Sequence, residues 1–194
     1  MRFVLLWRFE MKCTVEIASP EDMISVWALN HRVYCEELGQ HALDPSGSKV
    51  DRMHSVGVFF VAKVDGSVVG MLSITPPGAG GVSTLGRISS SMLRNSLHGV
   101  AEIRLLAVER RYRAKGIYDA LMLAVMGYCS LNKIDRVVIS AIGRQYRLYT
   151  LMGFKVLCGP IKEGGCEIRP MLLTRSDFEA SVYRKGRLAS MERK

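Results

Sequence analysis

The stretch AVERRYRAKGIYDALM, residues 107–122, joins the end of an apolar strand to an apolar helix through a basic loop. The predicted start of that helix carries the loop residues Arg113, Ala114, Lys115, Gly116 and Ile117. Free amides and the helix dipole attract anions at a helix N-terminus, and the loop's two basic side chains strengthen that field. The pattern therefore predicts a phosphate cradle, although an ordinary basic loop before a helix would look the same.

A second stretch, LYTLMGFKV at residues 148–156, follows at a distance that suits the first. Together they resemble the donor-binding loop and the Tyr-x-x-x-Gly-Phe signature of the Gcn5-related N-acyltransferase superfamily, over roughly residues 12–173. The resemblance implies an α/β (α+β) fold, with a mixed twisted sheet flanked by helices. It also implies a thioester donor, no metal and no bound cofactor.

The resemblance assigns roles to residues around the loop. The preceding strand is expected to expose backbone groups to the pantetheine arm of the donor through Leu105, Leu106, Ala107 and Val108. The phenol of Tyr149 is expected to protonate the departing thiolate. The alternative is that Tyr149 only packs beside Phe154.

Alternation along the strand AEIRLLAV places Glu102 and Arg104 on one face. Ile103 and Leu105 are then expected on the other face. A carboxylate beside the thioester could deprotonate an ammonium acceptor, directly or through water, while Arg104 holds the acceptor's carboxylate. The alternative is a structural ion pair between Glu102 and Arg104.

Two longer stretches, VWALNHRVYCEELG at residues 26–39 and KVDRMHSVGVFFVAKVDGSVVG at residues 49–70, narrow the resemblance. With AEIRLLAV they are similar to the acyl-homoserine lactone synthases and, more closely, to the N-acyl amino acid synthases. Both groups share the acetyltransferase fold but take long acyl chains from acyl carrier protein. Glu102 falls where the lactone synthases carry a strand glutamate, and Asp51 falls near their acidic loop.

Three departures disfavour a lactone synthase. Asn30 stands where an Arg is usual, Gln40 replaces a Trp, and Arg104 comes one residue early. An amino-acid acceptor is favoured, and the resemblance implies an aromatic one such as tyrosine, with Tyr34 as a further acceptor-binding candidate. The residues themselves support only an amine that bears an acidic group.

Tyr118 stands where the superfamily loop normally has Gly or Ala. Its bulk should hinder closure on the diphosphate of coenzyme A (CoA) and leave room for the single phosphate of phosphopantetheine. This favours acyl carrier protein as the donor, and the resemblance implies that the acyl group it carries is long; a CoA thioester is the alternative. An acetyl-CoA-dependent N-acetyltransferase and a lactone synthase stay open as alternative functions.

The chain has 27 Lys and Arg against 18 Asp and Glu, a net charge of +9, which indicates an acidic partner, a nucleic acid or an anionic surface. No interleaved basic and aromatic platform supports nucleic-acid binding, so the acidic carrier protein is the expected partner. Its candidate contacts are Arg110, Arg111, Arg184, Lys185 and Arg187, of which the last three also fit a solvated basic helix. Met122 and Met152 could line an acyl slot or simply belong to the core.

The 194 residues, 48% of them hydrophobic, fit a single acyltransferase domain over residues 1–194. Residues 1–11 are expected to form a leader, and residues 175–194 a basic C-terminal helix capped by Ser176. The apolar runs are far shorter than the roughly 18 residues that span a bilayer, which predicts a cytoplasmic protein without stable membrane insertion. The five scattered cysteines indicate neither a zinc site nor disulfides.

Local signals also predict the individual elements. A helix is expected from Ser19, as its N-cap, to Gly39, followed by a β-hairpin that turns at Asp65 and Gly66. Residues 84–98 are expected to form a surface segment or short helix. The later elements are strands at 101–108, 135–142, 154–159 and 167–173, with helices at 116–132 and 144–151.

Overall fold

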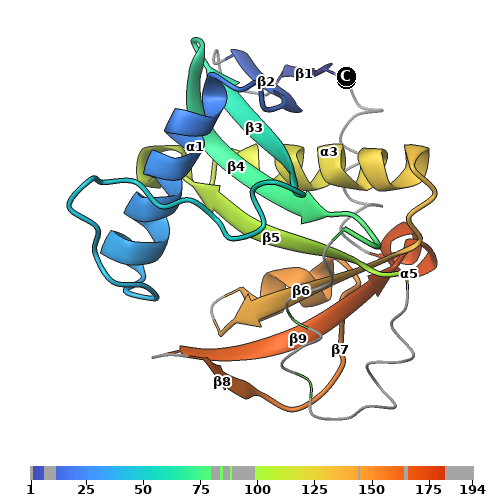
Figure 1. The fold of residues 1–194 in the computed structure, drawn as a ribbon. Helices are drawn as coiled ribbons and strands as arrows, with labels where there is room; N and C mark the ends of the chain where they lie inside the picture. Colours follow the sequence, from blue (N-terminus) through green and yellow to red (C-terminus); the bar gives the residue numbers. More distant parts are fainter. Residues whose placement is uncertain are drawn as a thin grey trace. The chain divides into compact units, whose positions relative to one another are not determined.

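The chain folds into a mixed β-sheet flanked by helices, as the computed structural model in Figure 1 shows. The structure describes residues 2–6, 12–79, 84, 88, 99–143, 145–163 and 166–181. The chain divides into two compact units. Unit 1 comprises Met1–Gly80 and Ile103–Lys133, and unit 2 comprises Gly81–Glu102 and Ile134–Lys194. The predicted mixed α/β architecture is confirmed, because parallel and antiparallel strand pairs occur in one sheet.

Unit 1 contains an antiparallel run of strands in the order β1 (Arg2–Leu6), β2 (Lys12–Ile17), β3 (Val58–Val64) and β4 (Ser67–Thr75). Strand β5 (Ala101–Val108) follows β4 in the sheet. Residues 2–6, expected in a leader, thus form a strand paired with β2. The predicted β3–β4 hairpin is confirmed, since Asp65 and Gly66 have φ of 49° and 80°, as a type I′ turn requires.

Helices cover both faces of β3 and β4, which explains why both strands are apolar along most of their length. On one face, α1 (Asp22–Asn30) and the π-helix η1 (His31–Glu37) share a core with the sheet. This core contains Val26, Leu29, Val33, Phe59, Val61, Met71 and Ala107. On the opposite face, α3 (Ile117–Leu131) lies against the sheet, with the rings of Phe60 and Tyr128 edge to face at 5.7 Å between centroids.

The first helix differs from its prediction. Instead of one helix capped by Ser19, α1 begins at Asp22 and gives way to η1 at His31. The backbone N–H of Ser19 donates to Asp22 Oδ2 (2.9 Å), so Asp22 satisfies an amide that precedes the helix, and no side chain caps α1. π-helices are rare and frequently mark functional sites, and η1 carries Tyr34.

Unit 2 is built on β6 (Arg136–Ile142) and β9 (Cys166–Thr174), which pair in antiparallel fashion. The start of β5 pairs in parallel with β6, with Ala101 opposite Val137 and Glu102 opposite Val138. The short strands β7 (Lys155–Val156) and β8 (Ile161–Glu163) both pair with β9. Helix α4 (Tyr146–Leu151) precedes β7, and α5 (Arg175–Ala180) follows β9.

The C-terminal helix begins with a different cap from the one predicted. Thr174 Oγ1, rather than Ser176, accepts the N–H of Asp177 (3.1 Å) at the start of α5. The predicted helix beyond Ser181, with Arg184, Lys185 and Arg187, lies outside the described residues. So does the predicted segment at 84–98, apart from Thr84 and Ile88.

Candidate active site

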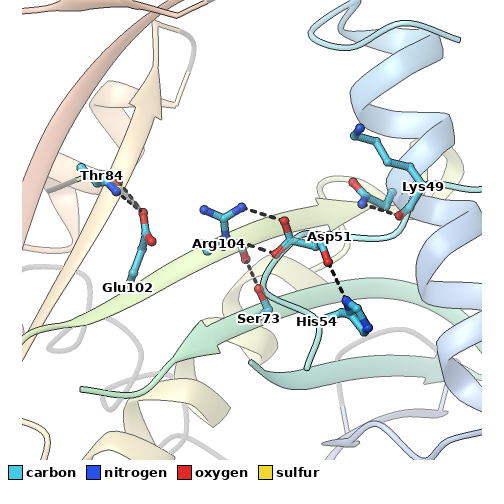
Figure 2. Close-up of polar contacts among 8 residues, drawn as sticks. Lys49, Asp51, His54, Ser73, Thr84, Glu102 and Arg104 are labelled. Carbon is cyan, nitrogen blue, oxygen red and sulfur yellow. Dashed lines mark hydrogen bonds and ion pairs between the residues drawn. The ribbon is translucent and has the colours of Figure 1, made fainter. Parts of the chain in front are cut away.

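Arg104, predicted to anchor the acceptor, forms an ion pair with Asp51 within unit 1 (Figure 2). Its Nη2 lies 2.7 Å from Asp51 Oδ1 and its Nε 3.3 Å from Oδ2, so both carboxylate oxygens meet the guanidinium. The side chains are only 15% and 8% exposed. Sequence reasoning placed Asp51 near the position of the acidic loop of the lactone synthases but missed this pairing across 53 residues.

The segment that carries Asp51 is fixed to α1. The N–H of Lys49 donates to Trp27 O (3.1 Å), and Asn30 Nδ2 donates to Lys49 O (2.7 Å). The backbone N–H and the ring Nδ1 of His54 both lie 3.0 Å from Asp51 O. Asn30, which stands where the lactone synthases have an Arg, is 1% exposed and supports this segment.

Strand β5 has an unusual backbone conformation at Leu105. Leu105 has φ of 50°, in the left-handed region that side chains rarely adopt. Leu105 packs against the core that α1 and η1 share with the sheet. Local backbone strain of this kind clusters at functional sites.

Tyr34, predicted to bind the acceptor, donates its hydroxyl to Leu106 O on β5 (3.1 Å). Burial raises the pKa of this phenol above its usual range, the nearby Arg104 opposes the shift, and Asp51 adds to it. Tyr34 therefore remains a protonated hydrogen-bond donor beside the Arg104–Asp51 pair. Its contact engages one of the carbonyls predicted to face the pantetheine arm.

The predicted phosphate loop has two residues with a left-handed backbone conformation just before its helix begins. It begins with the 3₁₀ helix η3 (Arg110–Tyr112) and ends where α3 starts at Ile117. Ala114 and Gly116 have φ of 61° and 79°, and no side chain caps the N-terminus of α3. The first amides of α3 thus have no intrahelical acceptor, as a helix N-terminus that binds an anion requires.

Arg113 braces this loop. Its Nε donates to Val108 O (2.9 Å), and its Nη2 pairs with Glu37 of η1. Lys115 is exposed and lies 5.4 Å from the ring centre of Tyr112. Tyr118 is half-buried in the first turn of α3. Arg113 is therefore tied to β5 and η1, which leaves Lys115 as the more accessible cation of the predicted cradle.

Glu102, predicted as the general base, is 2% exposed and belongs to unit 2. Both the N–H (3.1 Å) and the hydroxyl of Thr84 donate to its Oε1, as Figure 2 shows. Thr84 Oγ1 also lies 2.7 Å from Ser140 Oγ on β6. Sequence reasoning missed both hydroxyls. Alternation along β6 could have indicated Ser140, whereas Thr84 lies in a segment without a periodic pattern.

Tyr149, predicted to protonate the thiolate, is 2% exposed on α4. Its ring packs edge to face against the ring of Phe154, with the two centroids 5.4 Å apart. This is the contact expected if Tyr149 has a packing role. Gly153 has φ of 96°, and a Cβ there would lie 2.6 Å from Asp177 O. The Gly-Phe turn therefore has a structural reason, and proton donation by Tyr149 stays a prediction.

The structure also bears on the two methionines that were candidates for the acyl slot. Met122 and Met152 are fully buried, as core residues would be. Among the described side chains, no group of three or more His, Cys, Asp or Glu could hold a metal ion. No helix in the described ranges is both long and apolar enough to cross a membrane.

The fold is similar to that of solved N-acyltransferases. An acetyltransferase of the GNAT family from Staphylococcus aureus Mu50 matches with a TM-score of 0.59 and 13% identity, covering 84% of this chain and 98% of its own. The family model described as N-acyl amino acid synthase FeeM matches residues 25–177. The chain belongs to this family and is therefore an N-acyltransferase.

Solved structures agree with the family at the level of the fold. FeeM, an N-acyl amino acid synthase from uncultured soil microbes, matches with a TM-score of 0.71 and 18% identity, covering 88% of this chain and 95% of its own. The CoA-dependent acyl-homoserine lactone synthase BjaI, with SAM and isopentyl-CoA, matches with a TM-score of 0.66 and 20% identity, covering 82% and 80%. A search of curated protein sequences found no significant match.

Proposed function

We propose that this acyltransferase moves a long-chain fatty acyl group from the phosphopantetheine of acyl carrier protein to the amine of an amino acid. The acceptor is an aromatic amino acid such as tyrosine, and the reaction takes place in the cytoplasm. The observation that carries the proposal is Glu102, a buried carboxylate held by Thr84 in a chain of the N-acyl amino acid synthase family. A base is the group that an ammonium acceptor requires.

The proposed reaction needs one proton removed and one returned. Glu102 takes a proton from the acceptor's ammonium, and the freed amine attacks the thioester carbon. An N–C bond forms, the C–S bond breaks, and the thiolate leaves on phosphopantetheine. Tyr149 is the proposed donor of the proton that the thiolate receives.

We assign acceptor binding to Arg104 and Tyr34. Asp51 contacts the Arg104 guanidinium at Nε and Nη2. Asp51 thus orients Arg104, and the acceptor's carboxylate shares the same cation. The Tyr34 hydroxyl is fixed on Leu106 O, close enough to that cation for Arg104 to lower the pKa of the phenol against the effect of burial.

The donor is proposed to bind along Leu105 to Val108, with its phosphate at the loop from Arg113 to Ile117. The single phosphate of phosphopantetheine suits a loop whose Arg113 is already paired with Glu37 and whose helix has the bulky Tyr118 in its first turn. A CoA thioester is the second candidate donor, because the similar structure BjaI is CoA-dependent. No bound cofactor enters either version.

A thiol-release assay separates the donors. We expect the full-length protein to release thiol from long-chain acyl carrier protein only when an amino acid is present, with aromatic amino acids best. Acetyl-CoA with the same amino-acid panel is the comparison. Release from acetyl-CoA alone would replace the proposal by an N-acetyltransferase.

Tyr118→Gly tests the reason for the donor choice within that assay. The variant should bind CoA more tightly without using the carrier-bound donor faster, because the phenol no longer hinders closure on a diphosphate. Tyr118→Phe keeps the bulk and is the matched control. An unchanged CoA affinity in Tyr118→Gly would reduce Tyr118 to a packing residue of α3.

A further inference from the structure

The burial of Glu102 limits how it can act as a base. At 2% exposure the carboxylate offers almost no surface to an acceptor. Proton transfer requires hydrogen-bond contact, either direct or through an intervening group. The groups that contact Glu102 therefore decide whether it can reach the acceptor's proton.

Thr84 connects Glu102 to Ser140 within unit 2. The Thr84 hydroxyl has one hydrogen and gives it to Glu102 Oε1, the oxygen that also accepts the Thr84 N–H (3.1 Å). The remaining contact of that hydroxyl, 2.7 Å to Ser140 Oγ, must then use a Thr84 lone pair. Ser140 is the donor in this contact. Both hydroxyl hydrogens thus point along one chain toward Glu102.

Ser140 is the more exposed end of this chain. Thr84 is completely buried, whereas Ser140 is half-buried on β6. Glu102 lies opposite Val138 in the parallel β5–β6 pair, and Ser140 is two residues further along β6. The side chains of Glu102, Val138 and Ser140 therefore share one face of the sheet. The chain therefore runs from the buried carboxylate to a hydroxyl that is less buried than Thr84 and Glu102.

We propose that Ser140 and Thr84 form a proton relay between the acceptor amine and Glu102, an inference that rests on the proposed function. The ammonium N–H gives its proton to Ser140 Oγ, the Ser140 hydrogen passes to Thr84 Oγ1, and the Thr84 hydrogen passes to Glu102 Oε1. One N–H bond breaks and one O–H bond forms on Glu102. Each hydroxyl ends with one hydrogen, and the neutral amine is ready to attack the thioester.

The test measures steady-state thiol release by full-length variants over a range of pH. Ser140→Ala and Thr84→Val should lower kcat by about 10²-fold at neutral pH while the KM for the acyl donor stays the same. Ser140→Thr and Thr84→Ser keep the hydroxyls and should retain most of the activity. Raising the pH above the acceptor amine's pKa should restore kcat of Ser140→Ala, because the amine then arrives already deprotonated.

Ser181→Ala is the matched control. Ser181 is a buried residue of the same unit whose hydroxyl donates to Phe178 O (2.6 Å), so its loss removes a hydrogen bond outside the relay. Its kcat and pH profile should match the wild type. A Ser140→Ala variant with wild-type kcat, or with a loss that does not recover at high pH, would overturn the relay alone. A wild type that releases no thiol from any acyl thioester would overturn the proposed function and the relay together.

Discussion

At the scale of single residues, Asp51 and Arg104 depend on each other. Both are mostly buried, so removing one charge weakens the compensation of the other in a poorly solvated place. We predict that Asp51→Asn lowers the free energy of unfolding by about 3 kcal/mol, measured by urea denaturation.

The matched control is Asp135→Asn. Asp135 is 72% exposed and pairs with Arg175 (3.1 Å), so the same chemical change there should cost less than about 1 kcal/mol. Equal losses in the two variants would mean that burial of the Asp51 pair contributes nothing.

Contacts between individual side chains were harder to predict from the sequence than the elements or the fold class. Asp51 and Arg104 meet because Asn30 and Trp27 hold the backbone at Lys49, and no local pattern encodes such a long-range path. The positive φ of Leu105 was likewise invisible, because a Leu in an apolar run predicts an ordinary strand. Residue types indicated candidates for the chemistry, but the partners of those residues depend on tertiary structure.

At the scale of elements, α3 packs on β4 through Gly70. A Cβ at this position would lie 2.9 Å from Ile117 Cγ2 and 3.2 Å from Leu121 Cδ1. Gly70→Ala should therefore force α3 away from the strand and lower the free energy of unfolding by about 1–3 kcal/mol. Urea or thermal denaturation measures the change.

Gly143→Ala provides the comparison for Gly70→Ala. Gly143 follows β6, and a Cβ there meets nothing within 4 Å. Its substitution should change stability by no more than about 0.5 kcal/mol. A Gly70→Ala variant as stable as Gly143→Ala would show that the α3 side chains rearrange without cost.

Elements with local signals were predicted well. The Asp-Gly turn defined the β3–β4 hairpin because its backbone geometry requires those residues. Helix ends were predicted less well. The predicted Ser19 cap was wrong, because the Asp22 side chain instead accepts a hydrogen bond from the Ser19 amide. At the C-terminal helix, Thr174 is the cap in place of the predicted Ser176. The π-helix η1 and the two-residue strand β7 have no distinct pattern and depend on packing.

At the scale of the whole molecule, the fold class was readable because two motifs, spaced along one chain, fit one superfamily. The continuous apolar runs of β3 and β4 were also consistent with a sheet covered on both faces. The boundary between the two compact units, which falls between Glu102 and Ile103, could not be predicted from the sequence because it lies inside strand β5.

The net charge of +9 leads to the last prediction, which concerns the carrier protein. If an acidic carrier is steered to a basic surface, raising NaCl from about 50 to about 500 mM should lower kcat/KM for the carrier-bound donor about tenfold. An uncharged acyl-pantetheine donor should show little salt dependence.

Two variants that change the net charge equally test where the carrier docks. Arg110→Glu, beside the donor loop, should lower kcat/KM for the carrier-bound donor more than Lys162→Glu, at an exposed site on β8. Equal losses in the two variants would leave only a general charge effect, and a salt-independent rate would exclude electrostatic docking of the carrier.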